Sequence, residues 1–140
     1  DVGITTDVIV GFPGETEEDF QTTLQFAEKC GFAKMHIFPY SKRKGTPAEK
    51  MPNQVDEAVK SERAARLAAV DEKLHHKMLE SMVGKVVEVL FEQPVDAAHM
   101  EGLCGPYLRV VVPGTEELAN TIAQVKITGI VDDWLTGEIV

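Results

Sequence analysis

The strongest concentration of positive charge in this sequence is the run Lys42, Arg43 and Lys44, which lies just after Tyr40. Guanidinium and ammonium groups bind nucleic-acid phosphates by displacing counterions from the backbone. The run therefore favours contact with a phosphate. The alternatives are a solvated loop and an ion pair between Arg43 and a carboxylate of the same domain, and the residue types alone do not choose among them.

A second candidate for nucleic-acid contact combines Tyr107 with Arg109, and with Lys85 and Lys126 in neighbouring segments. Base stacking on aromatic side chains, together with phosphate contacts, is a common way to hold unpaired RNA. The alternative places Tyr107 in a core and leaves the charges solvated. Residues 79 to 140 contain three basic residues against ten acidic ones. A contact with nucleic acid must therefore be made by a local group of basic and aromatic side chains, because the overall electrostatic field of this region is negative.

The segment from Gly11 to Glu15 combines two glycines, the second being Gly14, with a proline and a carboxylate. Glycine permits backbone angles that other residues avoid and lets a ligand approach the main chain closely. Glu15 can accept a hydrogen bond from such a ligand. The alternative is a tight turn between a strand and a helix, with Glu15 favouring the positive end of the helix.

The cysteines and histidines do not form the pattern of a metal site. Cys30 and Cys104 are too far apart in the sequence for zinc ligands, which usually come in pairs a few residues apart. His75 and His76 are adjacent on an expected helix and point in different directions. His99 lies in an expected loop with no visible partner. We expect two reduced thiols and no metal bound by these residues.

The chain has 140 residues, of which 44% are hydrophobic, and a formal net charge of -9. This composition is typical of a globular protein. No stretch approaches the roughly 20 apolar residues that cross a bilayer, and the first residues lack the basic and apolar regions of a signal peptide. We therefore expect a soluble cytoplasmic protein without membrane contact.

Three expected elements position the glycine turn and the basic run. A stretch rich in β-branched residues at 4 to 11 predicts a strand, and the chain is expected to begin inside a larger domain. Thr16 is the predicted N-cap of a helix that ends at Gly31, with Asp19 completing the capping box. A second strand at 34 to 38 closes a parallel strand–helix–strand unit. Functional groups of parallel barrels lie at the carboxyl ends of the strands, where both candidate segments fall.

A long helix is expected from residue 54 to residue 82, because apolar residues recur there at helical spacing. Beyond it the periodicity changes to that of strands, which are expected at 83–91, 107–112, 122–131 and 134–140. Several short strands predict a small closed barrel, since closure removes exposed strand edges. The expected domain boundaries are 1–53, 54–82 and 83–140.

Two motifs in the first part of the chain are similar to motifs of the radical S-adenosylmethionine methylthiotransferases. Residues 5 to 20, TTDVIVGFPGETEEDF, resemble a late barrel strand of these enzymes and the turn after it. Residues 36 to 48, HIFPYSKRKGTPA, are similar to their Tyr-Ser-x-Arg-x-Gly-Thr-x-Ala loop. The resemblance implies an α/β segment in residues 1 to 53, namely the last units of a TIM-like parallel radical-SAM barrel.

The rest of the chain extends the resemblance. The segments MPNQV at 51 to 55 and KSERAARL at 60 to 67 match the linker helix of the branch that modifies N6-threonylcarbamoyladenosine beside the tRNA anticodon. Residues 83 to 140 resemble the TRAM domain, an all-β, five-stranded antiparallel OB-like barrel, most clearly in GLCGPYLRV at 102 to 110. The chain as a whole thus resembles the C-terminal part of such an enzyme.

The resemblance implies that the full-length enzyme adds a methylthio group to N6-threonylcarbamoyladenosine by radical chemistry. In the family, a 4Fe-4S cluster on a Cys-x-x-x-Cys-x-x-Cys motif splits S-adenosylmethionine, and a second 4Fe-4S cluster supplies sulfur. That motif is absent from the 140 residues. We therefore expect this chain alone to bind neither cluster nor cofactor and to be inactive.

The resemblance also assigns roles to individual residues. It implies a contact with S-adenosylmethionine for Gly11, Gly14 and Glu15, and no catalytic residue within the chain. It implies that the tRNA anticodon arm is bound by the basic loop and by one face of the barrel, through Lys42, Arg43, Lys44, Lys85, Tyr107, Arg109 and Lys126.

Three alternatives to this function remain open. The branch that modifies a ribosomal protein typically has an acidic residue where Arg43 stands, so Arg43 favours tRNA as substrate. The isopentenyladenosine branch shares this arginine but less often has FPY at 38 to 40 or the MP linker at 51 to 52. A non-catalytic module that docks a basic protein is the third alternative, and the acidity of residues 79 to 140 favours it.

Self-association is expected through the first strand. In a complete parallel barrel, residues 4 to 10 would pair with a further strand, and both faces, with Val8 and Val10 on one side and Ile9 on the other, would be covered. The chain has too few helices to cover both faces. Apolar strand edges tend to pair with another copy, so we expect a homo-oligomer formed through residues 4 to 38.

Overall fold

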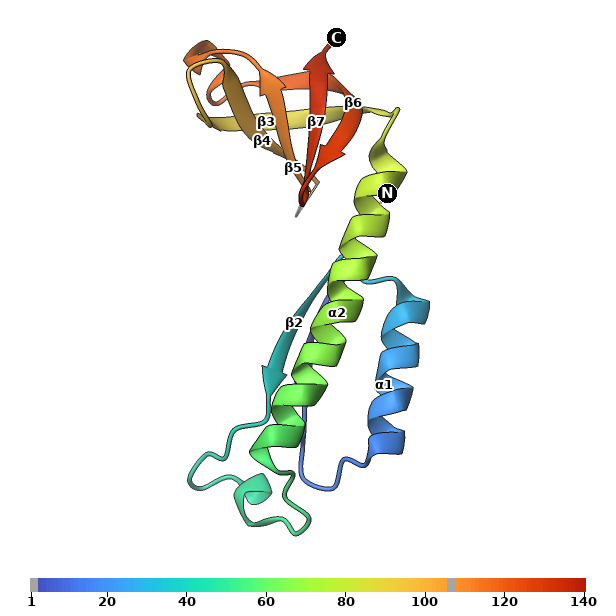
Figure 1. Ribbon diagram of the computed structural model, residues 1–140. Helices are drawn as coiled ribbons and strands as arrows, with labels where there is room; N and C mark the ends of the chain where they lie inside the picture. The colour runs from blue at the N-terminus through green and yellow to red at the C-terminus, as the bar shows by residue number, and fades with distance from the viewer. Residues whose placement is uncertain (1–2, 106–107) are drawn as a thin grey trace. The chain divides into compact units, whose positions relative to one another are not determined.

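The structure is a computed structural model that describes residues 3–105 and 108–140, and the chain divides into two compact units, Asp1–Leu74 and His75–Val140 (Figure 1). Unit 1 is an α/β arrangement and unit 2 is a β-barrel. Tyr107, one of the predicted RNA-binding residues, lies outside the described residues. None of the described helices is long and apolar enough to cross a membrane.

Unit 1 is built on the parallel strand–helix–strand unit that the sequence predicts. Strands β1 (Thr5–Val10) and β2 (Lys34–Pro39) pair in parallel, and helix α1 (Glu17–Cys30) connects them (Figure 1). The carboxyl ends of both strands therefore lie at the same edge of the two-stranded sheet. The glycine turn follows one strand and the basic loop follows the other. The larger TIM-like barrel stays a prediction.

Both ends of α1 are set by local sequence, as predicted. The hydroxyl of Thr16 accepts a hydrogen bond from the backbone N–H of Asp19 at 3.1 Å, and the Asp19 carboxylate accepts one from the N–H of Thr16 at 3.0 Å. This is the reciprocal capping box. Gly31 ends the helix in the left-handed conformation at φ 62°, which glycine adopts without steric cost.

The core of unit 1 lies on one face of the sheet, beneath α1 and the first part of α2 (Glu57–Met82). Val10 and Met35 of the strands are buried there with Phe20 of α1 and Leu67 of α2. Burying a side chain of this size contributes about 1.5–3 kcal/mol relative to leaving it in water. This packing, more than helix propensity, holds the two helices on the sheet.

The opposite face of the two-stranded sheet is exposed and mixed, with the polar pair Asp7 and His36 next to an apolar pair. Ile9 and Phe38 are partners in the β1–β2 register, and their side chains are 57% and 52% exposed. The alternation of β-strands explains the contrast, because neighbours such as Val8 and Val10 point to the helix side.

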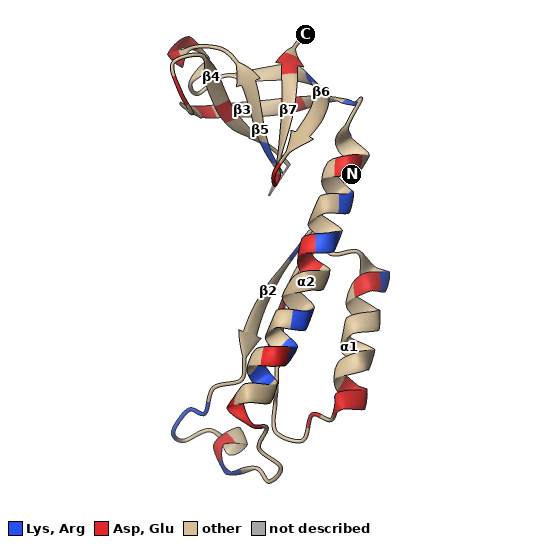
Figure 2. Ribbon diagram, viewed as in Figure 1, with Lys and Arg blue, Asp and Glu red and all other residues tan. Residues whose placement is uncertain are grey.

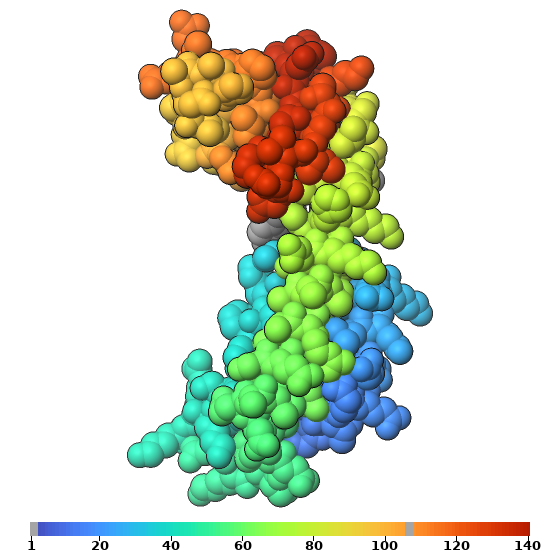
Figure 3. Space-filling view, viewed as in Figure 1, coloured from blue at the N-terminus to red at the C-terminus, as the bar shows by residue number. Residues whose placement is uncertain are grey.

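The segment before α2 departs from the sequence prediction, because the helix starts at Glu57 and not at residue 54. A short 3-10 helix, η1 (Pro47–Lys50), comes first. The Gln54 side chain donates hydrogen bonds to the carbonyls of Ala48 and Met51, both at 3.0 Å, so it closes this turn instead of entering the helix. In the space-filling view these residues form a protruding end of unit 1 (Figure 3).

Unit 2 is a closed five-stranded barrel with the strand order β3-β4-β5-β7-β6, which confirms the predicted closed barrel (Figure 1). One pairing differs from the antiparallel expectation, because β5 and β7 run parallel. The elements are β3 (Val86–Pro94), β4 (His99–Cys104), β5 (Leu108–Pro113), η2 (Glu116–Leu118), β6 (Ile122–Val131) and β7 (Trp134–Ile139).

Strand β4 was not among the strands expected from the sequence, and His99, expected in a loop, is its first residue. The strand has no β-branched residue and contains Gly102, so its local sequence gives a weak signal. A Cβ atom at Gly102 would overlap the backbone carbonyl of Leu90 on β3. The glycine is therefore required by the close approach of two strands, which is a tertiary contact.

The barrel interior is closed by the last turns of α2. Leu79 is buried against a core that includes Val89, Phe91, Val110 and Ile127. Met78 and Met82 of the same helix pack at the edge of this core. The long helix thus contributes side chains to both cores, and a barrel this small gains buried surface from it.

Candidate functional site

The Glu15 carboxylate folds back into its own turn. Its Oε1 accepts a hydrogen bond from the N–H of Gly11 at 3.0 Å and another from Nη1 of Arg63 at 2.8 Å. The same Arg63 nitrogen donates to the backbone carbonyl of Glu15 at 3.1 Å. The two side chains are only 7% and 13% exposed, Arg63 being the more buried. The turn after β1 is therefore held by a buried ion pair to α2.

A second buried cation, Lys60, occupies the space beside Gly11. Gly11 is buried at φ 75°, and a Cβ atom there would overlap the Lys60 side chain. Lys60 is 2% exposed, and its ammonium donates to Glu57 at 2.8 Å and lies 5.2 Å from the ring centroid of Tyr40. The close approach that Gly11 permits is thus made by a side chain of this chain.

Sequence reasoning missed that Lys60 and Arg63 are buried, although a signal exists. The two residues precede Leu67, Val70 and Leu74 at helical spacing, so they continue the stripe of α2 that packs on unit 1. Charged residues in such a stripe are rare unless they are paired. Their position on the apolar side of the helix therefore predicts buried cations that need a polar partner.

Among the predicted cofactor-binding residues, Gly14 is the one with free space beside its Cα atom. It has φ 88°, its N–H donates to the carbonyl of Asn53 at 2.9 Å, and no atom lies within 4 Å of the position a Cβ atom would take. The turn needs glycine here for its backbone angles alone. Of the three predicted contacts to S-adenosylmethionine, Gly11 and Glu15 have partners within the chain, and the contacts themselves stay predictions.

A cavity of about 600 Å³ lies at the carboxyl ends of β1 and β2. Phe12 and Tyr40 meet edge to face in its wall, with ring centroids 5.5 Å apart. The hydroxyl of Tyr40 is buried and has no hydrogen-bond partner among residues 3–105 and 108–140. The cavity is lined by Ile9, Phe12, Phe38, Pro39, Tyr40, Ser41, Arg43, Thr46 and Ala48.

The basic run borders this cavity. Arg43 lines it, and Lys42 and Lys44 are exposed in the loop that is blue in Figure 2. Within the described part of the chain, none of the three forms an ion pair. The pairing of Arg43 with a carboxylate of its own unit is therefore not observed, which leaves phosphate contact and a solvated loop.

Only some of the residues that were predicted to form an RNA-binding face of the barrel lie close together. Arg109 on β5 lies with its guanidinium carbon 5.0 Å from the ring centroid of Trp134 on β7, and it forms an ion pair with Glu101. Lys126 on β6 is the register partner of Glu138, and Lys85 precedes β3. Neither lysine lines the groove beside Arg109.

Two features beside Arg109 were not predicted. Trp134 is the one tryptophan of the sequence. His99, which was expected to have no partner, is hydrogen-bonded through Nδ1 to the carboxylate of Asp96 at 2.9 Å. The backbone N–H of Ala98, and then His99, hold the pKa of Asp96 below its usual value.

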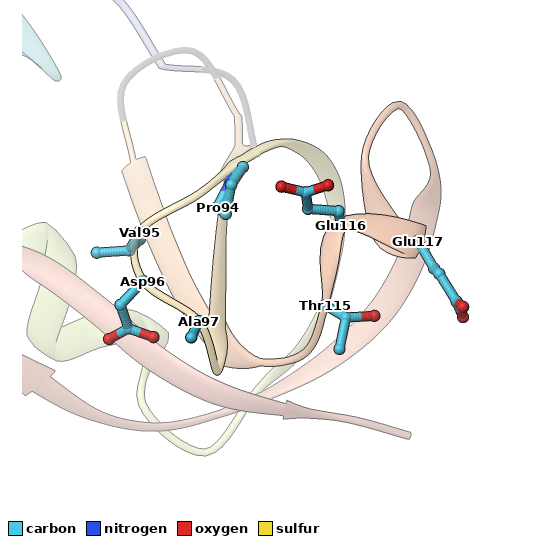
Figure 4. Close-up of a pocket in the computed structure, with 7 residues that line it drawn as sticks. All are labelled: Pro94, Val95, Asp96, Ala97, Thr115, Glu116 and Glu117. Atoms are coloured by element: carbon cyan, nitrogen blue, oxygen red, sulfur yellow. The ribbon is translucent and has the colours of Figure 1, made fainter.

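A shallow pocket next to this region is acidic and does not form a metal site. Its lining includes Asp96, Glu116 and Glu117, whose carboxylates point in different directions (Figure 4). No group of three or more His, Cys, Asp or Glu side chains in the described residues is arranged to hold a metal ion.

The cysteines do not provide an iron–sulfur site. Cys30 is exposed at the end of α1 in unit 1, whereas Cys104 is buried in the barrel. Burial raises the pKa of the Cys104 thiol, which disfavours the thiolate that a cluster requires. The residues present therefore do not fit a 4Fe-4S cluster.

The chain has well-matched relatives among tRNA-modifying enzymes, although no family model matches it. It is 43% identical over 130 residues to the threonylcarbamoyladenosine tRNA methylthiotransferase MtaB of Bacillus subtilis, covering 90% of this chain and 29% of the relative. It is 43% identical over 141 residues to the tRNA-2-methylthio-N(6)-dimethylallyladenosine synthase of Caldicellulosiruptor saccharolyticus, covering 100% of this chain and 30% of that protein.

A third relative, the enzyme of the same name from Acetivibrio thermocellus, is 53% identical over 92 residues, or 66% of this chain and 19% of that protein. The chain thus spans less than a third of the length of the relatives it matches. Identity above 40% along nearly the entire chain is much higher than the identity between proteins that share only a fold. Over the residues it contains, this chain belongs to the family of tRNA methylthiotransferases.

Proposed function

We propose that the protein to which this chain belongs adds a methylthio group to N6-threonylcarbamoyladenosine beside the tRNA anticodon. The observation that carries the proposal is the sequence identity to tRNA methylthiotransferases over nearly the whole chain. The position of Arg43 supports it, because this arginine lines a cavity at the carboxyl ends of two parallel strands. Such edges carry the functional groups of parallel barrels.

The choice of nucleoside rests on features of this sequence. The relatives include enzymes named for threonylcarbamoyladenosine and for dimethylallyladenosine, at the same 43% identity. The FPY triplet at 38 to 40 and the MP linker at 51 to 52 favour the first. Tyr40 and Arg43 line the same cavity, where they offer an aromatic ring and a cation to a polar modified base.

In this proposal S-adenosylmethionine and two 4Fe-4S clusters supply the radical chemistry, and their ligands come from residues outside this chain. In this proposal the chain forms part of the wall of the active site. Glu15, Arg63 and Lys60 fix the turn after β1, and Gly14 presents its exposed backbone at that turn. The Gly11 N–H and the Glu15 Oε1 are already hydrogen-bonded to each other, and the same oxygen pairs with Arg63. A direct contact of the cofactor with Gly11 or Glu15 would therefore have to use other atoms of these two residues.

The tRNA contacts form the second part of the proposal. Lys42, Arg43 and Lys44 carry charges that meet no carboxylate in the described structure, so they are available to phosphates of the anticodon arm. Arg109 of the barrel adds a second point of contact. We further propose a cytoplasmic location, as tRNA modification requires, and self-association of the 140-residue chain through residues 4 to 38.

The test is to express the full-length protein in a bacterial strain that lacks its own methylthiotransferases, and to analyse digested tRNA by liquid chromatography and mass spectrometry. The proposal expects the methylthio form of N6-threonylcarbamoyladenosine to appear. Appearance of the methylthio group on the isopentenyl nucleoside alone would assign the other branch. Absence of both products from a soluble, cluster-loaded protein would reject the function.

A further inference from the structure

The basic loop after β2 has a hydrogen-bonded backbone, although its side chains are exposed. Residues 43 to 46 form a turn in which the N–H of Thr46 donates to the carbonyl of Arg43 at 3.2 Å. Gly45, the third residue of the turn, has φ 84°, the positive value that a type II turn requires in this position. No atom of the described residues lies within 4 Å of the place that a Cβ atom would take. The glycine is therefore needed for its backbone angle alone.

The hydroxyl of Thr46 adds a second hydrogen bond to the same carbonyl. It donates to the carbonyl oxygen of Arg43 at 2.7 Å. Thr46 stands directly before the 3-10 helix η1, where a threonine hydroxyl commonly accepts a bond from the first turn, but it makes no such cap here. The hydroxyl instead fixes the main chain of Arg43. The Arg43 side chain therefore starts from a fixed point beside the cavity that it lines.

Glu49 stabilises the turn through its backbone and not through its cations. Its Oε2 accepts a hydrogen bond from the N–H of Gly45 at 3.1 Å. In the part of the chain that the structure describes, this carboxylate forms no ion pair with Lys42, Arg43 or Lys44. A carboxylate that bonds to a backbone amide leaves the neighbouring positive charges available to an anionic ligand.

The end of the loop is tied to the rest of unit 1. Gln54 donates to the carbonyls of Ala48 and Met51, and the carbonyl of Asn53 accepts a hydrogen bond from the N–H of Gly14 at 2.9 Å. The basic loop and the turn after β1 are thus connected through the main chain. A loop that is ordered in advance loses less conformational entropy when a ligand binds.

We propose that Thr46 and Glu49 are positioning residues, which hold the backbone of the basic loop so that Arg43 meets a phosphate of the anticodon arm in one geometry. Each of the two residues acts through Arg43 and does not bind the phosphate itself. The inference rests on the proposed tRNA function, because that function supplies the phosphate. It gives Gly45, Thr46 and Glu49 one shared task, which is to order Arg43 before the tRNA binds.

The test is the affinity of the full-length protein for a fluorescently labelled anticodon stem-loop RNA, measured by anisotropy at several salt concentrations. Thr46→Val keeps the shape of the side chain but loses the hydroxyl donor, so it is expected to weaken binding about fivefold. The salt dependence should also become shallower by somewhat less than one counterion, as in Arg43→Gln, because one phosphate contact is lost. Thr46→Ser keeps the hydroxyl and should bind within about twofold of the native protein.

Two further variants separate positioning from direct contact and from charge. Thr46→Val should cause no additional loss in an Arg43→Gln background, because Thr46 acts only through Arg43. Glu49→Met removes a negative charge, which by itself would strengthen the binding of RNA. The loss of its bond to the N–H of Gly45 should nevertheless weaken binding about threefold. The charge effect and the positioning effect therefore predict opposite signs.

Thr22→Val is the matched control. The hydroxyl of Thr22, which is exposed on α1, also donates to a backbone carbonyl, that of Glu18 at 3.2 Å. The same substitution thus removes the same kind of hydrogen bond away from the basic loop, and it should bind like the native protein. Hydrogen exchange of the β1 and β2 amides in each variant checks that unit 1 is folded.

The role of Thr46 is overturned by native affinity in Thr46→Val or in Arg43→Gln, by a Thr46→Ser protein as weak as Thr46→Val, or by an equal effect of Thr46→Val with and without Arg43→Gln. Tighter binding by Glu49→Met overturns the role of Glu49. The binding result is independent of the nucleoside analysis proposed above. Methylthiolated tRNA with native affinity in Thr46→Val rejects only the positioning role, and the expected affinities without methylthiolated tRNA reject only the enzymatic function.

Discussion

Arg63 binds Glu15 twice, through the carboxylate at 2.8 Å and through the backbone carbonyl at 3.1 Å, across 48 residues of sequence. One side chain of α2 thereby fixes both the charge and the main chain of the turn after β1. The Gly11 N–H shares the same carboxylate oxygen. The shape of the candidate cofactor turn therefore depends on a helix that follows the second motif.

Replacing Arg63 by Met should destabilise unit 1 strongly. The change leaves the Glu15 carboxylate buried without its partner, which typically costs about 3–5 kcal/mol. Hydrogen exchange of the β1 and β2 amides measures unit 1 separately from the barrel. Arg66→Met is the matched control, because Arg66 pairs with Glu17 on an exposed surface and should change little. Equal effects of the two variants would contradict the buried role of Arg63.

Gly11→Ala and Gly14→Ala should differ although both glycines have positive φ. Either alanine pays the cost of a left-handed backbone, about 1–2 kcal/mol, but only the one at Gly11 also overlaps Lys60. Gly11→Ala should therefore be the more destabilising in the same hydrogen-exchange experiment. Adding Lys60→Ala should recover part of the loss at Gly11 and none at Gly14. The absence of such coupling would show that Lys60 does not fill this space.

The two cysteines should differ in reactivity, and together they should not assemble a cluster. Cys30 is exposed, whereas Cys104 is buried with a raised pKa, so a thiol reagent should modify Cys30 at least about tenfold faster. Mass spectrometry after brief labelling measures this ratio. Anaerobic reconstitution with iron and sulfide should leave no stoichiometric cluster on the 140-residue chain. A stable charge-transfer band would contradict the assignment of the cluster ligands to other residues.

The 140-residue chain should self-associate through the exposed face of its two-stranded sheet. Ile9 and Phe38 form an apolar pair there, and placing such surface in water is unfavourable by about 25 cal/mol per Å². Light scattering should give a mass above that of the monomer, and Ile9→Lys should shift it toward the monomer. Ile122→Lys on β6, where Ile122 is 62% exposed and lies outside residues 4 to 38, is the control. A native chain that is monomeric at high concentration would refute the prediction.

The fold was predictable where local signals suffice. Thr16, Asp19 and Gly31 define α1 by hydrogen bonds within a few residues, so the sequence predicts both ends of the helix. Strand β4 was missed because its reason for being a strand is the contact of Gly102 with β3, and the helix start was misplaced because Gln54 bonds backward to the preceding turn. Tertiary contacts of this kind leave little trace in local composition.

The candidate sites show the same division. The basic run, the glycine turn and Arg109 are visible as residue types, and the sequence predicts them as candidates. Their partners are not visible in the sequence. Arg63 lies 48 positions from Glu15, and Trp134 meets Arg109 because β5 and β7 pair in parallel although β6 separates them along the chain. Which residues face each other depends on strand order, and the sequence pattern does not specify that order.

The most direct test of the account is the nucleoside content of tRNA from a strain that depends on the full-length protein, with and without Arg43→Glu. Native protein should produce the methylthio form of N6-threonylcarbamoyladenosine. Arg43→Glu places a carboxylate at the cavity where a phosphate is expected, and it should lower that product at least about tenfold through charge repulsion. Undiminished product with Arg43→Glu, or no such product with the native protein, would contradict the account.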